Sequence, residues 1–320
     1  MTLLAHEEPW AQWRAAMAGP RMHHAWILSG KRGVGKAGFA LAAARELVAE
    51  PGVPQPVEHH PDIIVLSHLP SSKEEEKKRD EGKPFQLKRN IAIDQIRQMQ
   101  QRLNTRPTLG SRRVIIIDPV DDLEKGASNA LLKSLEEPPQ GTFFLLVAHR
   151  PGRLLPTIRS RCRVLPFRAL GPDEMATALA REAPQADGAQ RAAAIAAAAG
   201  SPGVALEFVD LDLAPLHTLM GAIAATGDAD FKLRGKLADA IGARPSRERQ
   251  AAVIELARTV VASRMADTPM AQVPMLVDTN TDLALLATQF PIYNFDPGLL
   301  VMEIGTLLAH LAPTRAHAHG

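Results

Sequence analysis

The first residues in this chain that could do chemistry form a glycine-rich loop. Residues 30–37 read Gly-Lys-Arg-Gly-Val-Gly-Lys-Ala and match the phosphate-binding pattern G-x-x-x-x-G-K-[ST] except at the last position. In a working loop, backbone N–H groups cradle the phosphates, the lysine reaches the β- and γ-phosphates, and the final hydroxyl binds Mg²⁺. Ala37 has no hydroxyl to offer. The candidate nucleotide-binding residues are Gly30, Gly33, Gly35 and Lys36.

A second candidate group follows a run of β-branched residues. Asp118 directly follows the apolar residues 114–117. A hydrolysing enzyme of this layout carries at this position the carboxylate that holds Mg²⁺. In such enzymes a glutamate that polarises the attacking water comes next, but here Pro119 follows. Losing a general base of this kind costs about 10²–10⁴-fold in rate. Because the Mg²⁺ hydroxyl and the base are both absent, we expect the chain's own site not to hydrolyse a nucleotide.

An arginine in the sequence Ser160-Arg161-Cys162 could act outside the chain's own site. An arginine supplied by a neighbouring subunit stabilises the charge on a transferring γ-phosphoryl group, an effect worth about 10³–10⁵ in turnover. The planar fork of donors on an arginine suits this task better than the point charge of a lysine. An exposed turn with arginines on its surface is the competing interpretation, and the three residues alone do not decide between the two.

The elements that must position these residues alternate between strand and helix up to about residue 168. Short apolar runs predict buried strands, and amphipathic segments between them predict helices. This alternation predicts an α/β domain with a largely parallel sheet and helices on both faces. The predicted strands lie at 26–28, 62–66, 114–118, 143–148 and 163–167, and the predicted helices at 8–17, 36–50, 91–103 and 127–137.

Two segments depart from this alternation. Residues 67–90 are polar and mixed in charge, which predicts a surface insertion or mobile loop, with a short charged helix as the alternative. Beyond residues 170–172 the chain becomes rich in alanine and leucine and shows no convincing buried strand, so it is expected to be helical. The expected helical segments lie at 173–183, 185–199, 204–210, 228–242, 246–265, 280–289 and 297–311.

The composition sets broad limits. A chain of 320 residues suits two or three domains, and its net charge of +2 indicates a balanced surface at least as much as a nucleic-acid footprint. A single cysteine excludes a disulfide framework and a cysteine-based zinc site. No apolar run is long enough to span a membrane, and the N-terminus lacks the pattern of a signal peptide. We therefore expect a cytoplasmic protein.

Two long motifs carry a resemblance to a known family. Residues 128–139 read SNALLKSLEEPP and residues 154–162 read LLPTIRSRC. With these motifs the chain resembles the bacterial clamp-loader branch of the AAA+ family, over residues 8–168. Shorter segments that fit the same branch are His24-Ala25, His60-Pro61-Asp62, 93–97 and 200–206.

The resemblance implies three domains and a role in a ring of five subunits. An AAA+ P-loop NTPase-like domain would span 1–168 and contain the insertion at 67–90, followed by a helical lid at 169–210 and a helical collar at 211–320. The ring is the clamp loader of DNA polymerase III, which loads the sliding clamp onto primed DNA during replication. Its motor subunits hydrolyse ATP, and a stator subunit lends them the arginine of its Ser-Arg-Cys motif. On this resemblance Arg161 is that arginine finger in trans.

The same resemblance points to a subunit that does not hydrolyse ATP itself. The sensor-two arginine of the motor subunits would fall at Val204, and their sensor-one hydroxyl around Ala148-His149, so both are missing. Asp118 would then be vestigial. The implied partners are the gamma/tau motor subunits, the delta subunit, the sliding clamp and, through the complex, primed DNA, with no membrane.

The expectations for cofactors follow from the same comparison. No cofactor is required, although the retained Lys36 leaves weak binding of ATP or ADP open. Clamp-loader subunits often carry a four-cysteine zinc module after the first helix, but the corresponding region, about 47–66, has no cysteine. We therefore expect neither zinc nor another metal.

Two alternative functions stay open on the sequence. An active motor ATPase of the gamma/tau type would explain why Lys36 is retained, but Ala37, Pro119 and Val204 argue against it. A nucleotide-independent adaptor could instead bind DNA through a basic surface. The sequence lacks the aromatic and basic stacking platform typical of such adaptors.

Overall fold

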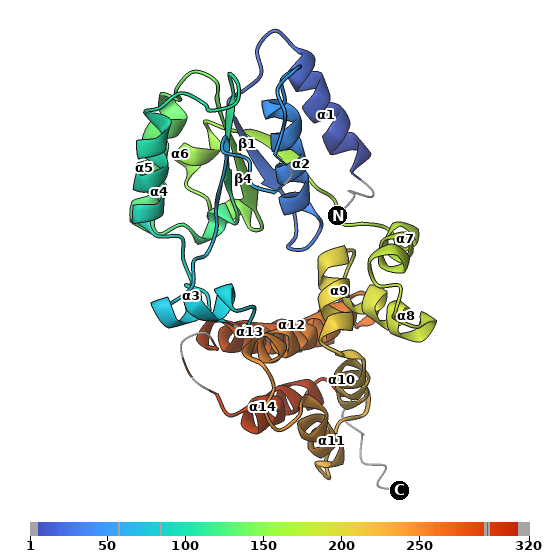
Figure 1. Ribbon diagram of the computed structural model, residues 1–320. Helices are drawn as coiled ribbons and strands as arrows, with labels where there is room; N and C mark the ends of the chain where they lie inside the picture. Colours follow the sequence, from blue (N-terminus) through green and yellow to red (C-terminus); the bar gives the residue numbers. More distant parts are fainter. Residues whose placement is uncertain (1–5, 57, 84, 291–292, 294, 313–320) are drawn as a thin grey trace, which may run out of the picture. The chain divides into compact units, whose positions relative to one another are not determined.

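The chain divides into two compact units, Met1–Leu170 and Gly171–Gly320. The computed structural model describes residues 6–56, 58–83, 85–290, 293 and 295–312. Figure 1 shows strands flanked by helices in the first unit and helices in the second. The predicted fold class, a P-loop α/β domain with a parallel sheet followed by helical segments, is confirmed. The finer division into three domains, with boundaries at 168/169 and 210/211, stays a prediction.

Five parallel strands form the sheet of the first unit, in the order β2-β3-β4-β1-β5. In its centre, Ile27 of β1 and Ile117 of β3 both lie opposite Leu146 of β4. The inner strands β1, β3 and β4 are buried on both faces and therefore read as apolar runs, which the sequence pattern detects well. The strands are β1 (Ala25–Ser29), β2 (Ile63–Leu66), β3 (Arg113–Ile117), β4 (Thr142–Ala148) and β5 (Arg163–Pro166).

Helices cover both faces of this sheet (Figure 1). On one face the ring of Trp13 packs edge-on against Trp26 at 5.5 Å between centroids, and Phe39 joins the same cluster. On the other face Met99 and Leu131 are fully buried against the strands. The first face is covered by α1 (Glu7–Ala18) and α2 (Lys36–Val48), and the second by α4 (Ile93–Leu103), α5 (Lys125–Glu136) and the short α6 (Pro156–Arg159).

The insertion at 67–90 contains a helix, α3 (Lys73–Asp80), and an isolated antiparallel bridge between Pro70 and Leu87. The insertion therefore forms the short charged helix, which was the alternative interpretation, and not a mobile loop. Ser72 caps this helix, since its hydroxyl accepts the N–H of Glu75 at 3.2 Å. Acidic residues in the first turn and basic residues in the last turn complement the helix dipole. These local terms form the helix although it buries no side chain.

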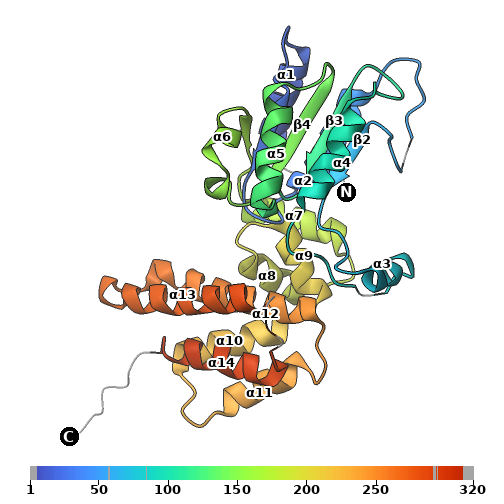
Figure 2. The same cartoon turned by 90° about the vertical axis from the view of Figure 1, so that its left-hand side faces the viewer.

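In the described part of the second unit the regular elements are helices, and α10 and α11 both pack against α14 (Figure 2). Helix α10 has no separate amphipathic signal because it is apolar on most sides, and α13 begins seven residues before the predicted segment. The helices are α7 (Pro172–Glu182), α8 (Gly188–Ala197), α9 (Pro202–Asp210), α10 (Ala214–Thr226), α11 (Lys232–Ile241), α12 (Arg247–Ser263), α13 (Val273–Gln289) and α14 (Pro297–Ala309). Short 3₁₀ helices in the chain lie at Val120–Asp122, Pro151–Arg153, Met265–Asp267 and Met270–Gln272.

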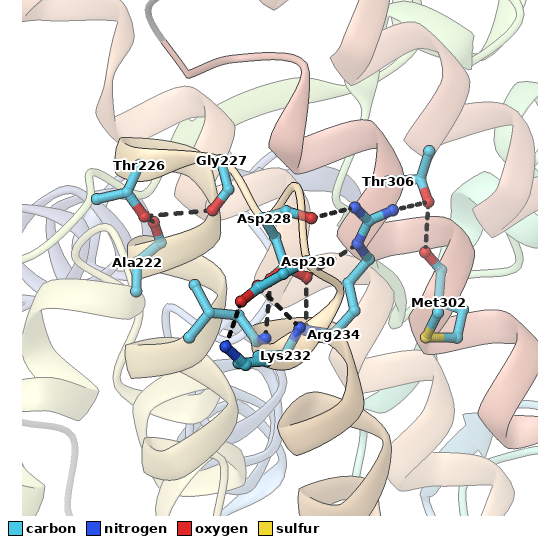
Figure 3. A network of polar contacts seen from close by, with 10 residues as sticks. Ala222, Thr226, Gly227, Asp228, Asp230, Lys232, Arg234, Met302 and Thr306 are labelled. Carbon is cyan, nitrogen blue, oxygen red and sulfur yellow. Dashed lines mark hydrogen bonds and ion pairs between the residues drawn. The ribbon is translucent and has the colours of Figure 1, made fainter.

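A buried ion pair joins Arg234 of α11 to Asp228 just before that helix, and the same arginine bonds to α14 (Figure 3). Arg234 donates from Nε to Asp228 Oδ2 at 3.0 Å and from Nη1 to Thr306 Oγ1 at 3.0 Å. The side chains of Arg234 and Asp228 are only 8% and 1% exposed. Gly305 leaves the space for this arginine, because a Cβ there would lie 2.5 Å from Arg234 Cγ. Every charge in this network is matched by a protein group.

No single helix among the described residues is both long and apolar enough to cross a bilayer. Helices α9 and α10 reach that length and hydropathy only when taken together, and the chain bends by 103° between them.

Candidate functional site

The glycine-rich loop connects the end of β1 to the start of α2 (Figure 1). Gly33 and Gly35 have φ angles of +78° and +101°, a region that glycine adopts far more readily than other residues. Gly30 has no room for a side chain, since a Cβ there would lie 2.4 Å from the carbonyl oxygen of Phe167 after β5. The shape of the loop therefore requires these glycines whether or not a phosphate binds.

Lys36 turns its ammonium group back onto the loop. Its Nζ donates to the carbonyl oxygens of Gly30 and Lys31, both at 2.6 Å, and the residue is only 2% exposed. Burial lowers the pKa of Lys36 to about 8, against the opposing effect of the negative charges of Asp118 and Asp121. The lysine thus stays charged at neutral pH, and the loop's own backbone supplies two acceptors for that charge.

A histidine outside the predicted site lies against the same loop. His6 Nε2 is 2.6 Å from the carbonyl oxygen of Val34, and the ring packs edge-on against Phe167. His6 is buried, and a Cβ on Gly35 would come within 3.0 Å of its Nε2. Sequence reasoning missed this residue because a lone histidine before the first helix belongs to no motif. Only the fold brings it to a loop 28 positions away.

Asp118 follows β3 at the same edge of the sheet. Its N–H donates to the carbonyl of Leu66 at 2.9 Å, which continues the pairing of β3 with β2. Burial raises the pKa of the Asp118 carboxyl, and the positive charge of Lys36 opposes that rise. The fold therefore brings Lys36 and Asp118 to one site, as their sequence motifs predict. Pro119, the next residue, is buried and carries no carboxylate.

The two acids further along this turn have structural partners. Asp121 accepts the N–H groups of His149 and Arg150 after β4, the second at 3.0 Å. Asp122 lies 3.3 Å from Nε2 of His68. Both carboxylates hold the strand ends together, so neither takes the place of the glutamate that Pro119 replaces.

Two histidines at this edge have opposite protonation behaviour. Burial, followed by the positive charge of Lys36, lowers the pKa of His149 to about 4, so this ring is neutral at pH 7. The hydrogen bond that the His68 ring donates to Asp122 raises the pKa of His68, and the same bond lowers the pKa of Asp122. The strand β4 ends in the fully buried Ala148, so the region expected for the sensor-one group presents an apolar residue and a neutral imidazole.

Arg161 follows α6 in the sequence, and α6 packs against α5. Its Nη2 is 2.6 Å from Oε1 of Glu136, and its Nη1 donates to the carbonyl of Thr157 at 2.8 Å. A weaker contact joins Nη1 to Ser160 Oγ at 3.4 Å. The Arg161 side chain is 34% exposed. Among the described residues, none of its polar partners belongs to the glycine-rich loop or to Asp118.

The remaining predicted positions have plain structural roles. Cys162 packs against the sheet core, and burial raises the pKa of its thiol to about 12. In the second unit Val204 is the third residue of α9, and its N–H donates to Ser201 Oγ at 3.4 Å. Within the described ranges, no group of three or more His, Cys, Asp or Glu side chains gathers as a metal site would require. The expectation of no zinc stays a prediction.

Comparisons with known proteins identify relatives of this chain. The sequence model of the family "DNA polymerase III, delta subunit" matches residues 5–171. DNA polymerase III subunit delta' of Pseudomonas aeruginosa is 26% identical, with 97% of this chain and 86% of that protein aligned. Subunit delta' of Escherichia coli is 33% identical over 62% of this chain and 58% of that protein.

A gamma/tau subunit and a solved structure were also found. DNA polymerase III subunit gamma/tau of Mycobacterium tuberculosis is 31% identical over 75% of this chain and 42% of that protein. The crystal structure of a DNA polymerase III gamma subunit-related protein from Thermotoga maritima is 18% identical, with a TM-score of 0.45 over 95% of this chain and 99% of that one.

The family match spans the whole α/β unit, including the glycine-rich loop and the Ser-Arg-Cys motif. The delta' relative from Pseudomonas aeruginosa extends the similarity over both units. The chain therefore belongs to the DNA polymerase III delta-subunit family, among the delta-prime subunits of the bacterial clamp loader.

Proposed function

We propose that this chain is a non-hydrolysing stator subunit of the DNA polymerase III clamp loader. In this role it helps load the sliding clamp onto primed DNA and lends Arg161 in trans to the active site of a neighbouring ATPase subunit. Its partners are the gamma/tau motor subunits and the delta subunit, with the clamp and primed DNA engaged through the complex in the cytoplasm.

One observation carries this proposal: the chain's two candidate phosphate-binding cations have opposite surroundings. Lys36 is buried and bonded to the carbonyls of its own loop, beside positions where Ala37 and Pro119 supply neither a Mg²⁺ ligand nor a base. Arg161 is one-third exposed, and its fork of donors lies outside that site. This arrangement supports chemistry in a neighbour's site rather than in the chain's own.

The donor set around Lys36 does not fit a site that hydrolyses Mg²⁺-bound ATP. The hydroxyl that coordinates the metal is absent, and the acids nearest to Asp118 are engaged with the ends of β2 and β4. A nucleotide is therefore not needed for the function, although Lys36 leaves weak binding of ATP or ADP open. The curated gamma/tau relative supports neighbours of that type.

The proposal is tested in a clamp loader reconstituted from the full-length subunits of one organism. Arg161→Ala should reduce turnover at the neighbouring ATPase site by about 10³-fold or more. The DNA- and clamp-stimulated ATPase rate of the whole complex then falls by at least the fraction that the neighbouring site contributes to it. Arg159→Ala is the matched control, because Arg159 is an exposed arginine on the same turn, and it should change the rate less than about twofold. An undiminished ATPase with Arg161→Ala would show that the arginine does not act in trans.

An active motor ATPase is the second candidate, and the retained Lys36 is the observation that favours it. The isolated chain would then hydrolyse ATP, and Lys36→Ala would abolish that activity. We expect no hydrolysis by the isolated chain, with or without Mg²⁺.

A further inference from the structure

The partner of Arg161 comes from a separate helix. Glu136 is the last residue of α5, and its Oε1 lies 2.6 Å from Nη2 of Arg161. On the preceding turns of α5, Leu131 and Leu135 are buried against the sheet, so the helix axis is held rigidly by the core. The carboxylate of Glu136 is therefore presented from a fixed element, whereas Arg161 follows the four-residue helix α6.

Local physical chemistry alone does not favour a glutamate at this position. The C-terminal end of a helix carries partial negative charge, which repels a carboxylate and attracts a cation. Glu136 and the next residue, Glu137, both stand at this end of α5. Lys133 is the basic residue in the last turn of α5, and Arg161 adds a second positive charge from outside the helix, directly against Glu136. A local preference that is broken and then compensated by a contact from elsewhere in the fold is typical of a position with a functional task.

The ion pair contributes little to folding. Its side chains are 34% and 48% exposed, and exposed pairs of this kind have small or unmeasurable effects on stability. The contact does limit the motion of a long side chain, together with the bond from Nη1 to the carbonyl of Thr157. A guanidinium has five N–H donors, and the contacts with Glu136, Thr157 and Ser160 use at most three of them.

We propose that Glu136 is a positioning residue for Arg161. Its carboxylate holds the guanidinium in one orientation and leaves two donors free for the γ-phosphoryl group of a neighbouring subunit. The entropic cost of ordering the Arg161 side chain then falls on the folding of this chain and not on the formation of the neighbour's transition state. The inference rests on the proposed function of Arg161 as a finger in trans.

The test uses the reconstituted clamp loader with the full-length chain. Glu136→Ala should lower kcat at the neighbouring site by about 2- to 10-fold, the effect expected from freeing one long side chain, with the KM for ATP unchanged. Glu136→Gln keeps an acceptor oxygen and should lose less. Glu137→Ala is the matched control, since Glu137 is an exposed glutamate at the same helix end, and it should leave the rate within about twofold.

A double-mutant cycle separates a positioning role from a structural one. In the Arg161→Ala background, Glu136→Ala should have no further effect, because the group it orients is gone. An equal loss in both backgrounds, or a lower melting temperature for Glu136→Ala alone, would mean that Glu136 acts on the fold, which overturns the inference. If Arg161→Ala lowers the ATPase but Glu136→Ala does not, the inference fails and the proposed function stands. If Arg161→Ala itself has no effect, both fail.

Discussion

The glycine-rich loop and the turn around Arg161 belong to the same α/β unit and treat their cations in opposite ways. In the loop, Lys36 is buried and bonds to two carbonyls of its own backbone. After α6, Arg161 is one-third exposed and shares its charge with a single, half-exposed carboxylate of Glu136. A cation whose donors are satisfied inside the fold has little left for a ligand, whereas an exposed fork of donors can still bind an anion.

Arg234 in the second unit extends this comparison to a purely structural arginine. Like Lys36 it is buried, and its donors are matched by Asp228 and Thr306 (Figure 3). The difference from Arg161 lies in the environment and not in the residue type. Burial with full pairing makes a charge important for stability, and exposure with partial pairing makes it available for binding.

The largest expected effect is on the neighbour's ATPase in the reconstituted complex. Arg161→Lys keeps the charge but loses the planar fork, so turnover at the neighbouring site should fall by at least about 100-fold. Lys36→Ala, in contrast, should leave the ATPase of the complex unchanged, because its ammonium bonds to its own loop and the proposed function needs no nucleotide there. Stimulated ATPase rates for the two variants check this directly. Equal losses of ATPase rate from the two variants would show that Lys36 and Arg161 do not differ in function as proposed.

The next effect is on stability in the second unit. Arg234→Met leaves the buried carboxylate of Asp228 without its cation and should cost about 3–5 kcal/mol in the free energy of unfolding. Arg161→Ala removes an exposed pair and should cost less than about 1 kcal/mol. Chemical denaturation followed by helical circular dichroism measures both. A small loss for Arg234→Met would mean that burial does not separate structural from functional arginines here.

A smaller loss of stability is expected from filling the tight contact in the loop. Gly30→Ala would place a Cβ 2.4 Å from the carbonyl oxygen of Phe167, and relieving that overlap should cost about 1–3 kcal/mol. Gly152→Ala is the control in the same unit, because a Cβ there meets nothing within 4 Å and should change the melting temperature little. If the two variants melt alike, packing does not explain the glycine at position 30, and a phosphate-binding role becomes the better explanation.

The smallest expected effect is the pH dependence of the contact between His68 and Asp122. The raised pKa of His68 contributes stability that is complete below its ordinary value and lost as the pH rises through the folded value. The lowered pKa of Asp122 contributes stability above its ordinary value that is lost in acid. The pair therefore stabilises the fold most between about pH 4 and 6.5.

Asp122→Asn should consequently cost more at pH 6 than at pH 8, by about 1 kcal/mol or less. Denaturation of both proteins at the two pH values gives the difference directly. His149 is present in both proteins, so the opposite effect of its lowered pKa largely cancels. A cost that does not change between pH 6 and pH 8 would argue against a charged His68.

Much of the α/β unit could be predicted because its signals are local. Strands β1 to β4 each contain an unbroken apolar run of at least four residues. Each predicted strand lies within two residues of the observed one. The helix at 73–80 was only an alternative, since a charged segment that buries nothing resembles a loop in composition. Helix α10 has no amphipathic period because its own residues are apolar on most sides, so the pattern that locates surface helices does not apply.

In the candidate site, too, the residues with local sequence signals could be predicted and the long-range contacts could not. Gly30, Lys36 and Asp118 could be predicted because each stands at the end of a strand or the start of a helix, where parallel topology brings such residues together. The contact of His6 with the loop and that of Glu136 with Arg161 could not, because each joins residues that share no motif.

By itself the sequence determined which chemical groups are absent and which are present. A missing hydroxyl at Ala37, a missing carboxylate at Pro119 and a guanidinium at Arg161 are properties of single residues, and no fold can change them. The tertiary structure alone decided how the retained cations are used. Whether a charge is buried and paired or exposed and available depends on contacts between distant segments, and those contacts exist only once the strand order β2-β3-β4-β1-β5 and its covering helices are in place.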